Sequence, residues 1–280
     1  MELHSRAFTF VDRITSLAPK ARITGRFTIP SSLAEFPQSV ISEAIGQLAA
    51  WSAMVAVDFK SRPVAGLAGC VELLGIARPG QTLELAADLE SVDDEAVSYG
   101  GAAFADGKPL VRLHHCVGPM VPMTEFADPV MMRARFEELC GDQGVTGGFA
   151  GLPPLALAPE LIEPGRCVRA RFVVPTSAPL FADHFPRRPV FPGSLLMHLK
   201  LRLVAALAAT LPPPQTNGAW SVLSVNDVKL RAFIAPGENF ELEAKLKRHS
   251  GSEATVLVQT RNGPRVIGSA RVELIPELSP

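Results

Sequence analysis

The segment that most constrains this chain is residues 184–193, which leads directly into the apolar segment 194–211. It contains one histidine, His184, together with three prolines and a glycine. Proline restricts the backbone and is tolerated only at the start of a helix. The pattern therefore predicts a fixed loop that holds a histidine beside the start of a long helix. A helix that is apolar nearly all round is typical of the centre of a domain.

A second apolar segment, residues 40–57, suggests that this unit occurs twice. Residues 22–30 precede it and residues 168–175 precede the later loop; both alternate polar and apolar side chains and stop at proline. Such alternation is typical of a half-buried strand. The two halves of the chain therefore share the order strand, then long helix.

The segments that follow the two helices also match. Residues 71–85 and 228–242 each carry a Pro-Gly turn between two alternating strands, and residues 105–109 and 261–264 carry hairpin signals. We therefore predict an α+β fold of two tandem repeats, each with an antiparallel sheet wrapped around a long central helix. The expected boundaries are 1–125 for the N-terminal repeat, 126–154 for a helix and a Gly/Pro-rich linker, and 155–280 for the C-terminal repeat.

The two repeats differ at the loop before the helix. Seventeen positions separate Pro175 from Pro192, but only seven separate Pro30 from Pro37. The first repeat lacks about ten residues, which are those that would carry its histidine. After these prolines the two repeats align again. Glu43 stands six residues after Pro37, and His198 stands six residues after Pro192.

These motifs resemble those of the 3-hydroxyacyl-[acyl-carrier-protein] dehydratases, the FabZ/FabA-like enzymes with a hot-dog fold. The family motif is His-Phe-Pro, then Pro-x-x-Pro-Gly, then a carboxylate fourteen residues after the histidine, and two subunits share each site. Here the position fourteen residues after His184 is His198, whereas Glu43 and Gln47 resemble the family's Glu-Ala-x-x-Gln. The resemblance implies a double hot-dog in which His184 and Glu43 form one complete site, and the second site is degenerate.

The resemblance also implies roles. A neutral imidazole of His184 would remove the C2 proton of a 3-hydroxyacyl thioester, and a protonated Glu43 would deliver a proton to the leaving oxygen. Free N–H groups at the start of the helix, above all that of Gly193, would stabilise the thioester oxygen. The further expected residues are Phe185, Pro192 and Gln47 for substrate binding, and Arg187 and Arg188 for carrier binding.

Composition limits the partners. The net charge of -1 does not favour nucleic-acid binding, and the four separated cysteines indicate reduced core thiols in a cytoplasmic protein. Met1 to Arg6 show no secretory signal. Residues 40–57 are long enough to span a membrane, but Glu43 and Gln47 favour a buried helix instead. We expect no metal and no cofactor, with the substrate carried on the phosphopantetheine arm of acyl carrier protein or coenzyme A.

Three alternatives to a dehydratase of fatty acid or polyketide-like biosynthesis remain open at this point. The first is a hot-dog acyl thioesterase, which would leave the His-Phe-Pro segment unexplained. The second is an (R)-specific enoyl-CoA hydratase, whose Asp and Asn before the histidine are absent. The third is a non-catalytic scaffold that binds an acyl chain or its carrier. The chain is expected to be a monomeric pseudo-dimer or a homodimer.

Overall fold

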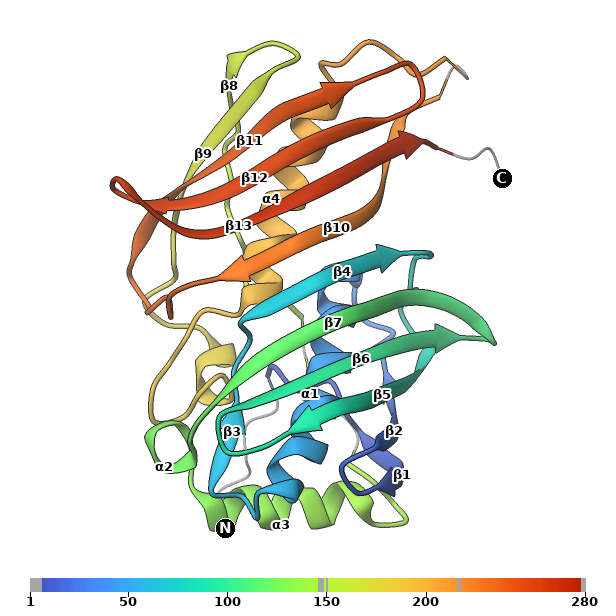
Figure 1. Cartoon of the computed structure of the whole chain (residues 1–280), viewed down its shortest axis with the longest axis vertical. Coiled ribbons are helices and arrows are strands. Elements are labelled where there is room, and N and C mark those ends of the chain that lie inside the picture. The colour runs from blue at the N-terminus through green and yellow to red at the C-terminus, as the bar shows by residue number, and fades with distance from the viewer. Residues whose placement is uncertain (1–6, 146–148, 150, 216–217, 278–280) are drawn as a thin grey trace.

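The computed structural model describes residues 7–145, 149, 151–215 and 218–277. Figure 1 shows the first half of the chain as the lower lobe, where strands surround the helix α1. Its elements are β1 (Arg13–Ala18), β2 (Arg22–Thr28), α1 (Gln38–Ala56), β3 (Ser61–Pro63), β4 (Leu67–Leu73), β5 (Thr82–Val92), β6 (Ala96–Ala105) and β7 (Lys108–Pro122).

Two helices, α2 (Met123–Phe126) and α3 (Pro129–Cys140), lead out of this lobe. Asp128 is the N-cap of α3 and accepts hydrogen bonds from the backbone N–H groups of Val130 and Met131, and Pro129 occupies the first position of the helix. Both features are typical helix starts. The expected short helix before the linker is confirmed. Residues 146–148 and 150 of the predicted linker, and Met1 to Arg6, lie outside the described residues.

The second half forms the upper lobe around the helix α4 (Figure 1). Its elements are β8 (Glu160–Glu163), β9 (Cys167–Val173), the 3-10 helix η1 (Pro179–Ala182), α4 (Gly193–Ala208), β10 (Trp220–Leu230), β11 (Asn239–His249), β12 (Ala254–Asn262) and β13 (Arg265–Pro276).

The strands form one antiparallel sheet that runs through both lobes. Its order is β1-β2-β5-β6-β7-β4-β10-β13-β12-β11-β9-β8, and the short β3 pairs with β7. The two halves join where β4 pairs with β10, for example Val71 with Val225. Read outward from this junction, corresponding strands follow in the same order in both halves. The Pro-Gly turns also correspond, since Gly80 and Gly237 have positive φ angles of 84° and 81°, a conformation that favours glycine.

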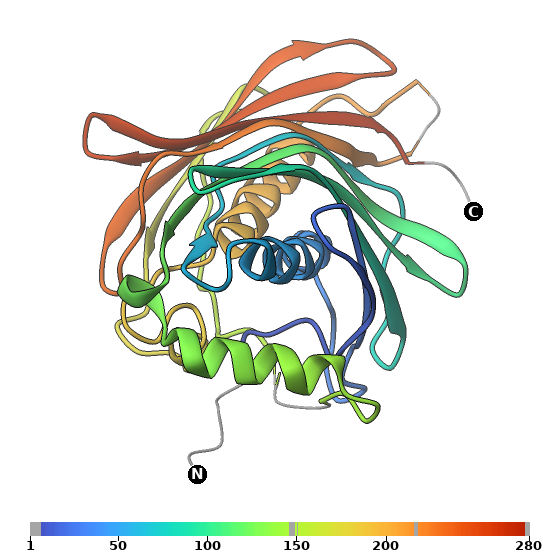
Figure 2. The same cartoon turned by 60° about the horizontal axis from the view of Figure 1, so that its bottom comes forward.

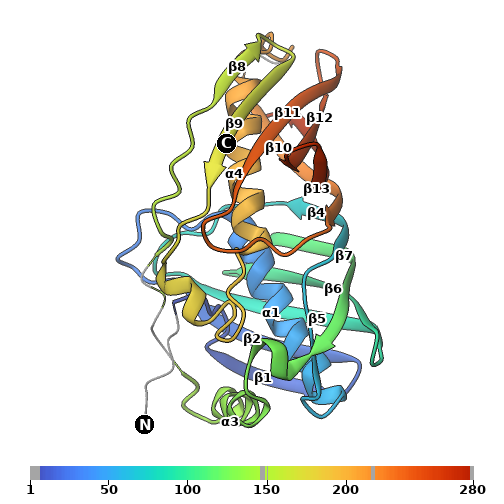
Figure 3. The same ribbon diagram turned by 90° about the vertical axis from the view of Figure 1, so that its left-hand side faces the viewer.

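The helices α1 and α4 lie on the concave side of the sheet, and α3 lies across the open side of the lower lobe (Figures 2 and 3). Both long helices begin directly after a proline, Pro37 for α1 and Pro192 for α4. Glu43 and His198 therefore occupy corresponding helix positions, as their spacing predicted. One buried apolar cluster extends through both lobes and includes Leu48 of α1 and Leu199 of α4.

Several expectations about single residues can now be compared with the structure. No helix in the described part of the chain is long and apolar enough to cross a membrane. All four cysteines are free, but only Cys116 and Cys167 are buried; Cys70 is partly buried. The expectation of four core thiols is wrong for Cys140, which is exposed because α3 buries only one of its residues, Leu139.

Candidate active site

The loop after η1 holds His184 in one orientation. The imidazole Nδ1 lies 2.9 Å from the carbonyl oxygen of Val190, and the N–H of Val190 donates back to the carbonyl of His184, also at 2.9 Å. Because a carbonyl can only accept, Nδ1 must carry the proton. The imidazole stacks on Phe185 with ring centroids 4.2 Å apart and meets the edge of Phe8 at 5.6 Å. In the neutral ring, Nε2 therefore keeps its lone pair for a ligand.

Glu43 is held by donors from both halves of the chain. One carboxyl oxygen accepts a hydrogen bond of 2.8 Å from the hydroxyl of Ser194, at the start of α4. The other accepts one of 3.2 Å from Gln47 Nε2, one helical turn further along α1. Two donors stabilise a carboxylate in particular, because charge strengthens such hydrogen bonds.

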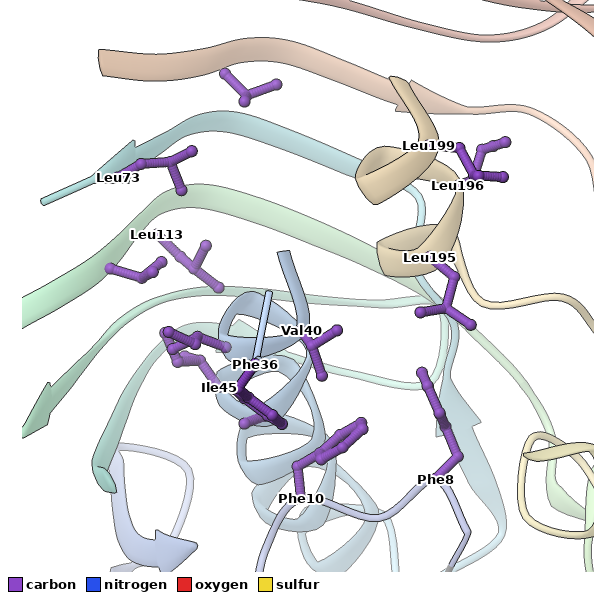
Figure 4. Packing of buried hydrophobic residues seen from close by; sticks show 14 of the residues in the cluster. Phe8, Phe10, Phe36, Val40, Ile45, Leu73, Leu113, Leu195, Leu196 and Leu199 are labelled. Atoms are coloured by element: carbon purple, nitrogen blue, oxygen red, sulfur yellow. The ribbon is translucent and has the colours of Figure 1, made fainter. Parts of the chain in front are cut away.

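Gln47 is in turn fixed by the segment before β1. Its Oε1 accepts from the N–H of Phe10 at 2.9 Å and its Nε2 donates to the carbonyl of Phe8 at 3.1 Å. The N–H of Phe8 donates to Asp183 at 2.9 Å, directly before the histidine. Figure 4 shows Phe8 and Phe10 beside α1, with Phe8 below Leu195 of α4. This segment thus links Gln47 to the histidine loop.

His184 and Glu43 line the same cavity, which has a volume of about 510 Å³. Gln47, Gly193, Ser194, Phe185 and Arg62 also line it. Trp51 and Met54 of α1 also line it, together with four residues of α3, namely Met131, Met132, Arg135 and Leu139. Most of the remaining wall is apolar. The cavity therefore suits a ligand with a long apolar part and a few polar atoms.

Burial controls the charge of the histidine. Desolvation lowers the pKa of His184, the negative charge of Glu43 opposes this shift, and the positive charge of Arg62 adds to it. Burial also lowers the pKa of the Arg62 guanidinium to about 10, so that it remains a cation at neutral pH. A neutral imidazole with a free Nε2 is a suitable general base near pH 7.

Two further polar groups of the cavity remain uncharged. Burial raises the pKa of the Tyr99 phenol well above its usual range, and it raises the pKa of the Cys116 thiol to about 12. The two side chains lie close enough for each to influence the pKa of the other. Tyr99 and Cys116 therefore offer neutral hydrogen-bonding groups near Glu43 and no nucleophilic thiolate.

The remaining predicted residues have distinct places. Gly193 is the first residue of α4, after its N-cap Pro192, and a Cβ added to it would come within 2.5 Å of Leu230 Cδ1. Pro192 does not line the cavity, nor does His198. Burial lowers the pKa of His198, whose charged neighbours are Arg202 and Glu35. In the described residues no three His, Cys, Asp or Glu side chains gather as metal ligands would.

The two arginines expected to bind a carrier have partners within the chain. Arg187 pairs with Asp128 at 3.0 Å and donates to the carbonyl of Thr124, and Arg188 pairs with Glu125 at 3.4 Å. All three partners belong to the segment around α2, in the other half of the chain. The arginines therefore connect the histidine loop to the first lobe.

Three site residues were missed in the sequence: Ser194, Arg62 and Phe8. Ser194 directly follows the Pro-Gly of the loop, so its place in the first helical turn was a readable signal. Arg62 comes from the short strand β3, and no motif surrounds it. Phe8 lies beside His184 only because the chain folds back over α1, which no local pattern indicates.

Comparison with known proteins gives a consistent result. The model of the ApeI-like family, described as ApeI dehydratase, matches residues 162–265. The 3-hydroxyacyl-[acyl-carrier-protein] dehydratase FabZ of Anaeromyxobacter sp. (strain K) is 33% identical over 105 residues, which is 36% of this chain and 67% of the relative. That of Sorangium cellulosum (strain So ce56) is 30% identical over 99 residues, which is 34% of this chain and 64% of the relative. The match thus spans about two thirds of these relatives.

Among solved structures, a putative oleoyl thioesterase from Lactobacillus plantarum aligns with a TM-score of 0.61 at 10% identity. The alignment covers 92% of this chain and 98% of that one. At this identity the likeness concerns the fold alone. A large antiparallel sheet with few helices, and neighbours of this kind, identify a hot-dog fold.

Proposed function

Because the chain belongs to the FabZ family of 3-hydroxyacyl-[acyl-carrier-protein] dehydratases, we propose that it converts a 3-hydroxyacyl thioester to the trans-2-enoyl thioester by loss of water. The observation that carries this proposal is the shared cavity. It is lined by a histidine whose Nε2 is free and by a glutamate that both halves hold in place.

In the proposed reaction, Nε2 of His184 takes the proton from C2 and the C3–O bond breaks as the C2–C3 double bond forms. The reaction starts from the form of the enzyme in which Glu43 carries a proton. Glu43 gives this proton to the departing oxygen, so that water leaves and the carboxylate form remains. The donors Ser194 and Gln47 stabilise that carboxylate. Transfer of the proton from His184 to Glu43 then restores both groups.

The thioester oxygen gains negative charge as the C2 proton is removed. The N–H of Gly193 starts α4 and has no acceptor among the described residues, as expected for the first turn of a helix. We assign it to this oxygen, where a fixed donor lowers the barrier. The lack of a Cβ at this position leaves room for Leu230.

The proposed architecture is a double hot-dog that arose by duplication, with one complete site per chain. Its support is the identical strand order on either side of the β4–β10 junction and the corresponding positions of Glu43 and His198. In this proposal His198 marks the degenerate site. The substrate arrives on the phosphopantetheine arm of acyl carrier protein. Arg187, which lines the cavity, and Arg188, which follows it in the loop, meet the carrier with the part of their side chains that remains exposed.

A product assay tests the function. The purified chain is incubated with 3-hydroxyacyl-[acyl carrier protein] and the enoyl thioester and free thiol are both quantified. We expect enoyl product from the wild type and from the control His198→Ala, and a loss of at least about 100-fold in His184→Ala and Glu43→Ala. Free thiol as the main product would indicate a thioesterase, and full activity of His184→Ala would refute the site.

A further inference from the structure

The charge of Arg62 favours the neutral form of His184, but the proposed dehydration gives its hydrogen-bond donors no acceptor. Its guanidinium lies over the ring of Phe185, 3.9 Å from the centroid. Its Nε atom is fully buried and has no hydrogen-bond partner in the part of the chain that the structure describes. No carboxylate of the described residues lies within ion-pair distance of it, and Glu43 influences its pKa only through longer-range charge.

An unpaired guanidinium is costly at such a place. Buried charges are normally paired, and an unsatisfied buried donor costs about 1–3 kcal/mol, more when it is charged. The surroundings of Arg62 increase this cost, because Phe185, on which it stacks, belongs to an apolar cluster with Val64, Phe126 and Val190. Stacking on Phe185 compensates only part of the charge. The described residues therefore leave at least one donor of Arg62, its Nε–H, without an acceptor, and a ligand in the cavity could supply one.

The same cavity contains two other orphan groups. The hydroxyls of Ser39 and Ser42, on α1, are buried without hydrogen-bond partners, and both residues line the cavity with Arg62. A purely hydrocarbon acyl chain would fill the cavity and leave all three groups unsatisfied. A chain with an additional oxygen would satisfy at least the strongest donor among them.

We propose that Arg62 is a specificity-determining residue that binds an additional oxygen function on the acyl group, beyond C3. The substrate class is then oxygenated 3-hydroxyacyl thioesters, in preference to plain alkyl chains of the same length. A carboxylate and a neutral carbonyl are the two forms of this acceptor. This inference rests on the proposed function in that it takes the ligand to be an acyl thioester.

Binding of unreactive analogues tests the inference without turnover. Pantetheine amides of 3-hydroxyacyl groups are prepared in matched length, ending in methyl, methyl ketone or carboxylate, with the oxygen moved stepwise along the chain. Dissociation constants are measured by calorimetry. We expect the best oxygenated analogue to bind the wild type at least about tenfold more tightly than the alkyl analogue.

The variants separate a specific contact from a structural effect. Arg62→Met should remove the preference, and Arg62→Lys should retain part of it for the carboxylate only. Arg133→Met is the matched control, because Arg133 also lies over a phenylalanine, Phe59, at 4.8 Å, but outside the cavity. Circular dichroism checks that each variant is folded.

Two results would overturn the inference: equal or tighter binding of the alkyl analogue by the wild type, or a preference that survives in both Arg62 variants. A failure of the proposed function would give a different result from a failure of the inference about Arg62. The wild type would then bind oxygenated analogues selectively through Arg62 and yet form no enoyl product.

Discussion

The hydroxyl of Ser194 donates a 2.8 Å hydrogen bond to the carboxyl group of Glu43, 151 positions earlier in the chain. This contact joins the start of α4 to the second turn of α1. Ser194 follows Gly193, whose N–H we assign to the thioester oxygen. The orientation of the proposed acid and the proposed oxyanion donor therefore depends on the same helical turn.

Ser194→Ala should reduce kcat/KM about tenfold or more, because a hydrogen bond to a charged group contributes about 1.5–3 kcal/mol. Ser194→Thr keeps the hydroxyl and should retain more activity than the alanine variant. Enoyl formation is measured for both, with thermal unfolding as the check on folding. If the two variants are equally impaired, the hydroxyl is not what positions Glu43.

The pH dependence of kcat/KM should follow the neutral form of His184. Since burial lowers the pKa of this group, the acid limb of the profile should have its midpoint below the ordinary histidine value of about 6.5. Arg62→Met removes a cation that favours the neutral ring, so the midpoint should move to higher pH. An acid limb above 6.5 in the wild type, or a downward shift in Arg62→Met, would contradict this description of the site.

Gly193→Ala should lower kcat/KM, because the new Cβ would come within 2.5 Å of Leu230 Cδ1 and displace the helix start. Since the clashing atom is the end of a flexible side chain, Leu230→Ala in the same chain should restore part of the activity. Rates of enoyl formation for the single and double variants provide the comparison. The steric explanation fails if the double variant is no more active than Gly193→Ala.

Lys200 predicts a pH-dependent stability that is unrelated to catalysis. It lies on α4, is only 1% exposed, and has no ion pair among the described residues; burial lowers its pKa to about 7. Between pH 7 and about 10 the unfolded chain binds more protons than the folded chain, so stability should rise with pH in this window.

Lys200→Met should therefore raise the free energy of unfolding at pH 7 by an amount on the order of a few kcal/mol and flatten this pH dependence. Denaturant unfolding at several pH values measures both effects. Lys247→Met, at an exposed position of β11, is the control. A less stable Lys200→Met protein would mean that the amine has a favourable role in the core.

The sequence alone predicted the helix starts and turns that depend on a proline or a glycine at one position. Prolines 37 and 192 fixed the starts of both long helices, and the common spacing from them placed Glu43 and His198 in register. The Pro-Gly turns and the Gly-containing hairpins were predicted for the same reason, because each needs a particular residue at a particular backbone conformation.

Other features depended on contacts between distant segments. The partners of Arg187 and Arg188 lie around α2, and Arg62 reaches Phe185 from a strand of three residues. Within β7, the adjacent residues His114 and His115 are both exposed, which departs from the alternation of buried and exposed residues along the strand. A positive φ of 52° at His115 interrupts the alternation, and a period-two pattern cannot reveal such a bulge.

In the proposed site, one chain supplies both His184 and Glu43, each from a different half. The most direct test mixes the two inactive variants, His184→Ala and Glu43→Ala, by co-expression with different tags and measures enoyl formation by the co-purified and the unfractionated protein. Because each variant lacks one member of its own site, the mixture should remain as inactive as the variants alone. If His184 of one chain met Glu43 of another, about a quarter of the wild-type rate would return in the unfractionated protein and about half in the co-purified protein. Either recovery would contradict a site that is built within one chain.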